Sequence, residues 1–105
     1  MSEIVKKNWP LIQFVCTTRN QKAIKCILEN LTRNQVKLLS EISLNVLIGN
    51  ISISKYYKKK LKRQKNLLTS WTKESELQKR KSFANSVATV KELLKASYKV
   101  LQTVT

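Results

Sequence analysis

The side chains of this chain that could do chemistry are mostly cations, and they are concentrated in one segment. The 105 residues hold 21 Lys and Arg against six acidic residues, which gives a formal net charge of +15. No acidic residue occurs between Ile42 and Lys73. Such a single-sign segment predicts an anionic partner, and a polyanion before any other. The basic residues of its dense centre are Lys55, Lys58, Lys59, Lys60, Lys62, Arg63 and Lys65.

The kind of cation indicates the kind of binding. Lysine supplies 17 of the 21 basic residues, and it is a point charge that suits phosphate, whereas base readout relies on the arginine fork and on Asn or Gln. Gln64 and Asn66 lie two residues apart, so they do not share a helical face. We therefore expect contact with the phosphate backbone of DNA, or of RNA, without regard to sequence. A second basic run would extend the contact: Lys79, Arg80 and Lys81.

Other interpretations compete for the same cations. A solvated lysine face can simply keep a small protein soluble, and residues 58–65 also fit a nuclear-localisation patch. A basic amphipathic helix can lie on an anionic membrane, but the apolar stripe here is narrow, so we do not expect a membrane partner. Tyr56, Tyr57 and Trp71 could stack on the bases of a single strand, although Tyr57 and Trp71 fall on the face that the core should cover.

Several kinds of chemistry are excluded by composition. The chain has no His and no Asp, which removes Ser-His-Asp and Cys-His nucleophiles and HExxH zinc sites. The six Glu are scattered, so we expect no enzyme, no metal and no cofactor or small-molecule substrate. Cys16 and Cys26 lie among apolar residues and are expected to be buried free thiols. The sequence has no signal peptide or membrane-spanning run, which predicts an intracellular protein of the nucleus or of a virion.

Length and patterning predict one small all-α domain. A single Gly and a single Pro argue against sheets and phosphate loops, which need many turn residues. Helices are expected from about Asn8, over 21–29, from the Thr32 capping box to Gly49, over 55–70 behind a Ser54 cap, and over 82–102. This makes a bundle of four to five helices with its core in about 8–70, a trihelical centre loosely like a helix-turn-helix, and a long C-terminal helix.

The third of these helices is apolar nearly all round, so it is either central to the core or part of an interface. The second possibility supports an alternative function, a non-enzymatic assembly or minor capsid subunit that binds itself, a capsid protein or an acidic partner. Its candidate interface residues come from this helix and from the apolar stripe of the last one. They are Leu44, Leu47, Ile48, Val90 and Leu94.

Residues 35–68 resemble a group of small basic proteins of adenovirus-like DNA elements, the Polinton/Maverick elements, adintoviruses and their relatives. The pattern has a helix ending in Glu-x-x-x-Asn-x-Leu-x-Gly-Asn, a short apolar-Ser/Thr linker, then a basic helix with Lys-Leu-x-Arg and trailing leucines. The matching residues here are Glu41, Asn45, Leu47, Gly49, Asn50, Ile53, Ser54, Lys60, Leu61, Lys62, Arg63, Leu67 and Leu68.

The resemblance implies a virion-core or minor capsid protein that touches packaged DNA. It covers about a third of the chain, and the Asn45–Asn50 element is its most specific part. The group often continues into a Gly-Gly pair and an apolar tail. This chain has no such pair and carries a predicted helix there instead, which puts any role that depends on the tail in doubt.

Overall fold

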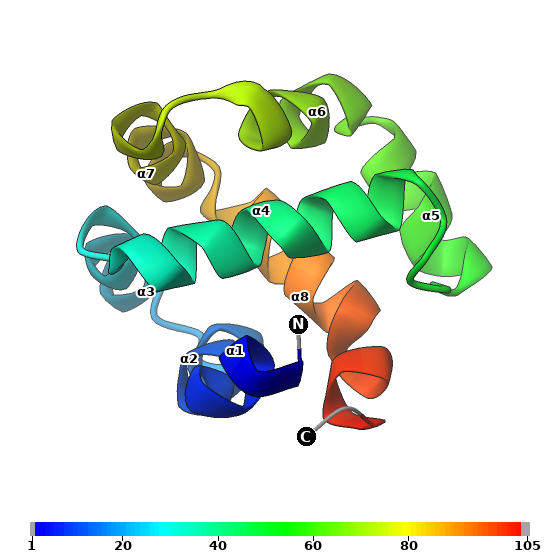
Figure 1. Cartoon of the computed structure of the whole chain (residues 1–105), viewed down its shortest axis with the longest axis horizontal. Helices are drawn as coiled ribbons and strands as arrows, with labels where there is room; N and C mark the ends of the chain where they lie inside the picture. Colours follow the sequence, from blue (N-terminus) through cyan, green and yellow to red (C-terminus); the bar gives the residue numbers. More distant parts are fainter. Residues whose placement is uncertain (1, 104–105) are drawn as a thin grey trace.

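Eight helices make up most of the part of the chain that the computed structural model describes, residues 2–103, in which no strand occurs (Figure 1). The predicted all-α class is confirmed, and the predicted count of four to five helices is too low. The helices are α1 (Ser2–Lys7), α2 (Trp9–Thr17), α3 (Gln21–Glu29), α4 (Arg33–Leu47), α5 (Lys55–Lys62), α6 (Lys65–Lys73), α7 (Glu76–Asn85) and α8 (Val87–Thr103).

Helix α4 runs through the middle of the molecule, with α6 along one side, α1 and α2 on the other, and α8 crossing behind it (Figure 1). Its Leu38, Leu39 and Ile42 are buried, which places most of this helix in the core. Ser40 and Ser43 are buried beside them and donate to the carbonyls four residues earlier, so their hydroxyls do not lack partners. Helix α3 packs mainly on α7, and α4 packs mainly on α6. The predicted central helices are therefore covered by helices from the C-terminal half of the chain.

Local signals set the ends of the central helices. The Thr32 hydroxyl accepts from the Gln35 amide at 3.2 Å, and the Gln35 side chain accepts from the Thr32 amide at 2.9 Å, which completes the expected capping box. Gly49 has a φ of +82°, the left-handed conformation that ends α4. Ser54 then caps α5 by accepting from the Tyr57 amide.

Two predicted long helices are each broken in two. The expected basic helix 55–70 bends at Arg63 and Gln64, where the Gln64 amide donates to Leu61 in a tight i−3 bond. The break lets α5 pack on α8 while α6 turns to lie on α4. The expected helix 82–102 breaks at Ser86, whose backbone is not helical, so α7 can pack on α3 while α8 packs on α2 and α5.

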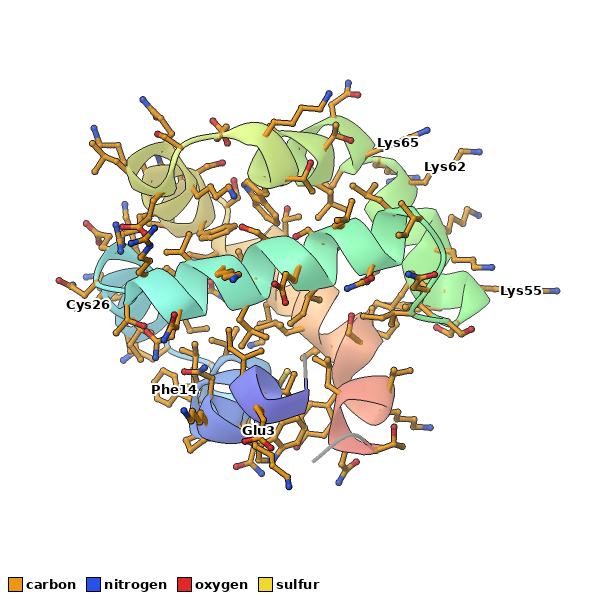
Figure 2. All side chains as sticks on the ribbon, viewed as in Figure 1. Glu3, Phe14, Cys26, Lys55, Lys62 and Lys65 are labelled. Carbon is orange, nitrogen blue, oxygen red and sulfur yellow. The ribbon has the colours of Figure 1, made fainter. Side chains whose placement is uncertain are left out.

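The N-terminal quarter differs from the prediction in several details. Helix α1 was not expected, and Asn8 does not cap α2 with its side chain but donates to the Ile4 carbonyl of α1 at 2.8 Å. The predicted helix 21–29 is capped by Asn20, whose side chain accepts from the Ala23 amide. Cys26 was expected to be buried and is exposed on α3 (Figure 2), while Cys16 is half-buried against the core.

Trp71 anchors the segment that follows the basic residues 55–65 in the core. Its side chain is fully buried, packs edge-on against Phe83 with ring centroids 4.9 Å apart, and donates its indole N–H to the Ser82 hydroxyl at 2.7 Å. Leu61 and Leu68 are buried with it, so the predicted apolar stripe of residues 55–71 does dock on the core. Its remaining member, Tyr57, is half-buried. The cations of that segment are therefore left on the outer surface.

Candidate nucleic-acid interface

The turn between α4 and α5 positions the basic helix at one edge of the molecule (Figure 1). The Asn45 side chain donates to the Glu41 carbonyl at 2.8 Å and accepts from the Asn50 side chain at 3.3 Å. The Ile51 amide donates to the Asn45 carbonyl at 3.1 Å, and buried Ile51 fixes the linker on the core. The Asn45–Asn50 element thus forms the turn that directs α5.

All seven predicted basic residues of 55–65 are exposed. Figure 2 shows Lys55, Lys62 and Lys65 pointing outward from the same edge of the molecule. Among the seven, Lys60 is the one that forms an ion pair within residues 2–103, with Glu92 at 3.9 Å. Since that contact is long and solvent-exposed, it leaves the positive charge of α5 largely uncompensated.

One face of this segment holds a lysine-rimmed slot. Lys58, Lys62 and Lys65 follow one another at i, i+4 and i+7 and surround a hollow of about 160 Å³. None of the described residues lining it is acidic. The three exposed lysines therefore border an apolar floor. The floor is made by Val46, Leu47, Ile53, Leu61 and Leu68.

The other face of α5 combines cations with an exposed aromatic ring. Tyr56 is 55% exposed and stacks on Tyr57, with ring centroids 5.0 Å apart and planes within 8° of parallel. The Lys60 ammonium lies 4.5 Å from the centre of the Tyr56 ring. Hydrogen bonding to Tyr56 and, to a smaller extent, the charge of Glu92 raise the pKa of Lys60 above its ordinary value. Tyr56, Lys59, Lys60 and Arg63 line a hollow here.

The second basic run does not adjoin the first. Lys79, Arg80 and Lys81 lie on α7, at the opposite end of α4 from α5 (Figure 1). Arg80 is occupied within the fold, because it pairs with Glu76 at 2.9 Å and donates to the Leu31 carbonyl at 2.7 Å. Lys79 is half-buried in a groove that Glu76 also lines, and Lys81 is exposed.

The predicted protein-interface residues are divided by the structure. Val90 and Leu94 are fully buried inside this chain, because α8 uses its apolar stripe to pack on α2, α4 and α5, so this fold leaves neither side chain accessible to a partner. Leu47 is half-buried beneath the lysine-rimmed slot. Leu44 and Ile48 are 45% and 59% exposed and share one side of the end of α4.

Further residues face α5 from α8 and were not predicted as part of a site. Lys91, Lys95 and Lys99 recur at i+4 spacing, and Tyr98 lies beside them, packed on Trp9 with ring centroids 5.0 Å apart. Lys91 donates to the Thr18 carbonyl at 2.7 Å, whereas Lys95 and Lys99 are exposed. The lysine row is visible in the sequence, but only the packing of α8 on α5 brings it next to Tyr56 and Tyr57.

Across residues 2–103 no group of three or more metal-ligating side chains comes together, and no helix there is both long and apolar enough to cross a membrane. Burial raises the pKa of the Cys16 thiol to about 11, against the opposing charges of Lys95 and Lys91. Comparison of the chain with protein-family models, with curated proteins and with solved structures finds no match.

Proposed function

We propose that this chain is a non-enzymatic nucleic-acid-binding protein that contacts the phosphate backbone of DNA, without sequence preference, through the basic residues 55–65. The observation that supports this function is that seven exposed cations lie on one short segment and a single long ion pair, Lys60 with Glu92, opposes them in the part of the chain described. Arginine forks, which would favour base readout, are scarce there: Arg63 is the one arginine of the segment.

The dimensions of the segment suit a duplex. Helix α5 has eight residues and is therefore about 12 Å long. A DNA duplex presents one negative charge per about 1.7 Å of axis, or roughly seven charges over that length. Like charges at i, i+4 destabilise a helix, by a few tenths of a kcal/mol per pair, so a polyanion bound here would also relieve repulsion within α5.

The biological setting forms part of the proposal. We infer a virus- or element-encoded core protein that packages DNA in the nucleus or in the virion. The support is the resemblance of residues 35–68 to the Polinton/Maverick and adintovirus group, together with the role of Asn45 and Asn50 in the turn that directs α5. Binding to RNA is the nearest variant of this function, because phosphate contacts alone do not distinguish the two backbones.

Salt-dependent binding to random-sequence duplex DNA tests the proposal. A four-site variant carries Lys58→Ala, Lys59→Ala, Lys62→Ala and Arg63→Ala. Its control loses the same charge elsewhere through Lys6→Ala, Lys7→Ala, Lys22→Ala and Lys25→Ala, four exposed residues of α1 and α3. The control matters because a change in net charge alone weakens any polyanion contact.

About six phosphate contacts predict a slope near −5 when the logarithm of the binding constant is plotted against that of the salt concentration. The four-site variant should reduce this slope by three or four, whereas the control should keep it near the wild-type value. Binding weaker than micromolar at low salt, or an equal loss of slope in both variants, would count against α5 as the site.

A second candidate function is assembly, and the exposure of Leu44 and Ile48 favours it. Leu44 lines a groove of about 320 Å³ between α4 and the α6–α7 region, and Ile48 follows Leu44 by four residues, just after the end of α4. Sedimentation of the wild type and of a Leu44→Ser, Ile48→Ser variant tests it. A wild-type dimer or larger species that the double variant dissociates would support assembly, and a wild-type monomer at high concentration would argue against self-association.

A further inference from the structure

Three neighbouring hollows follow one another from α5 onto α8: the first is lined by α5 alone, and the other two include side chains of both helices. The first and second both include Tyr56 and Lys60, and the second and third both include Tyr57 and Lys95. The third ends beside Tyr98 on α8. We call this feature the tyrosine groove and define it by Tyr56, Tyr57, Lys59, Lys60, Lys95 and Tyr98.

The aromatic rings of the groove are held in place from beneath. Tyr57 is half-buried and supports the exposed ring of Tyr56 by parallel stacking at 5.0 Å. Tyr98 is half-buried and packs on Trp9. A supported aromatic ring on an exposed residue can act as a stacking platform, because little conformational freedom is lost when a flat ligand binds to it.

The Lys60 ammonium now occupies the position above Tyr56 that a base would take. It is an exposed contact on a flexible side chain, and base–aromatic stacking is the stronger interaction. A base can therefore displace the ammonium, which would then be free to pair with the neighbouring phosphate. The groove thus provides for both parts of a nucleotide at the same place.

Cations line the tyrosine groove from both helices. Lys59 and Lys60 come from α5, and Lys95 and Lys99 come from α8. The single acidic residue among the lining side chains is Glu92, which pairs with Lys60. Alternating aromatic rings and lysines along a groove is the arrangement by which proteins hold unpaired strands.

From this arrangement we propose that the tyrosine groove binds single-stranded nucleic acid, with a base stacked on Tyr56 and phosphates on Lys59, Lys60 and Lys95. The inference rests on the proposed nucleic-acid function and goes beyond it by naming an unpaired strand and a second face of α5. A duplex keeps the faces of its bases covered by their neighbours, so an intact duplex has nothing to stack on Tyr56, whereas an unpaired base does.

The test measures the fluorescence anisotropy of three labelled probes as the full-length chain is added. The probes are a 12-nucleotide oligo-dT, an abasic strand with the same number of phosphates, and a random-sequence duplex of 12 base pairs. The variants are Tyr56→Leu, which removes the ring, Tyr56→Phe, which keeps it, and Lys95→Gln, matched by Lys25→Gln on α3. Tyr56 and Lys95 are exposed, so these changes leave the core intact.

We expect the wild type to bind oligo-dT about tenfold or more tightly than the abasic strand, since stacking acts only through the base. Tyr56→Leu should abolish that difference, Tyr56→Phe should keep it, and neither should alter duplex binding. Lys95→Gln should weaken both single strands by several-fold more than Lys25→Gln does.

Three results would overturn the inference. Equal binding of oligo-dT and the abasic strand, with a steep salt slope for the duplex retained, refutes the groove but leaves the duplex function standing. Weak, shallow binding of all three probes refutes both. In a third outcome, polyglutamate displaces labelled oligo-dT as efficiently as unlabelled oligo-dT of equal charge does, and Tyr56→Leu does not change this competition. That result would point to an acidic protein partner instead.

Discussion

Neighbouring cations play different parts in this molecule. Arg80 lies partly buried and holds Glu76 and the Leu31 carbonyl, while Lys81, the next residue, extends into solvent. Lys60 contacts Glu92 and the Tyr56 ring, while Lys59 forms no ion pair in the described part of the chain. Sequence patterning identifies these cations only as a group. It cannot tell them apart, because their roles depend on which long-range partner each side chain contacts.

Arg80 and Lys81 give a direct test of this difference. Arg80→Gln should lower the free energy of unfolding by about 1 to 3 kcal/mol, because it removes a donor to the Leu31 carbonyl and a charge-assisted bond to Glu76. Lys81→Gln changes charge by the same amount at an exposed position and should stay within about 0.5 kcal/mol of the wild type. Urea denaturation followed by circular dichroism measures both, and equal effects would mean that Arg80 is not a structural residue.

Cys16 gives a prediction about pH. Burial raises its pKa from 9.0 to about 11, so the reactive thiolate is scarce at neutral pH and becomes the main form only above about pH 11. In a Cys26→Ser variant, the rate of alkylation by iodoacetamide should therefore keep rising about tenfold per pH unit up to pH 10. The same variant unfolded in urea should level off near pH 9. A folded-state plateau near pH 9 would contradict the burial of this thiol.

At the scale of elements, sequence patterning predicts those features that depend on residues close together. The bounds 21–29 of α3, the Thr32 capping box and the Gly49 stop all follow from short-range chemistry. The breaks at Gln64 and Ser86 do not, since each lets two helices reach different partners far away in the sequence. The basic half of the candidate site was predictable as a charge run, whereas the tyrosine groove exists only once α8 packs on α5.

The free energy of unfolding can distinguish the buried from the exposed residues of the predicted protein interface. Leu94→Ala should cost about 2 to 5 kcal/mol, because its side chain is fully buried in the core formed by α8. Ile48→Ala should change the free energy of unfolding by less than about 0.5 kcal/mol, since this side chain is 59% exposed just after α4. Urea titration of the two variants measures the difference. A large loss for Ile48→Ala, dependent on protein concentration, would instead indicate a stabilising oligomer.

At the scale of the whole molecule, the excess of positive charge acts against the compact state. The net charge of +15 lies within a globule of 12.4 Å radius of gyration, and its described ion pairs are few and mostly exposed. Self-repulsion of this kind destabilises a folded protein, and mobile anions weaken it by screening. The chain should thus be more stable when a bound anion or screening salt is present.

The thermal midpoint of the folded chain should therefore rise with salt concentration. Helix α5 and its cap contain like-charge pairs at i, i+4, among them Lys55–Lys59, Lys58–Lys62 and Lys59–Arg63, and relieving them recovers about 1 kcal/mol. For a domain of this size that corresponds to a shift of about 4 to 8 °C. Raising sodium chloride from 10 to 200 mM should produce a shift of this order, and the four-site variant should show less than half of it. Polyphosphate at equal ionic strength should stabilise the wild type further, because multivalent binding adds to screening. A midpoint independent of salt in both proteins would mean that the cations of α5 do not repel one another in the fold. A bound polyanion would then relieve no repulsion within α5.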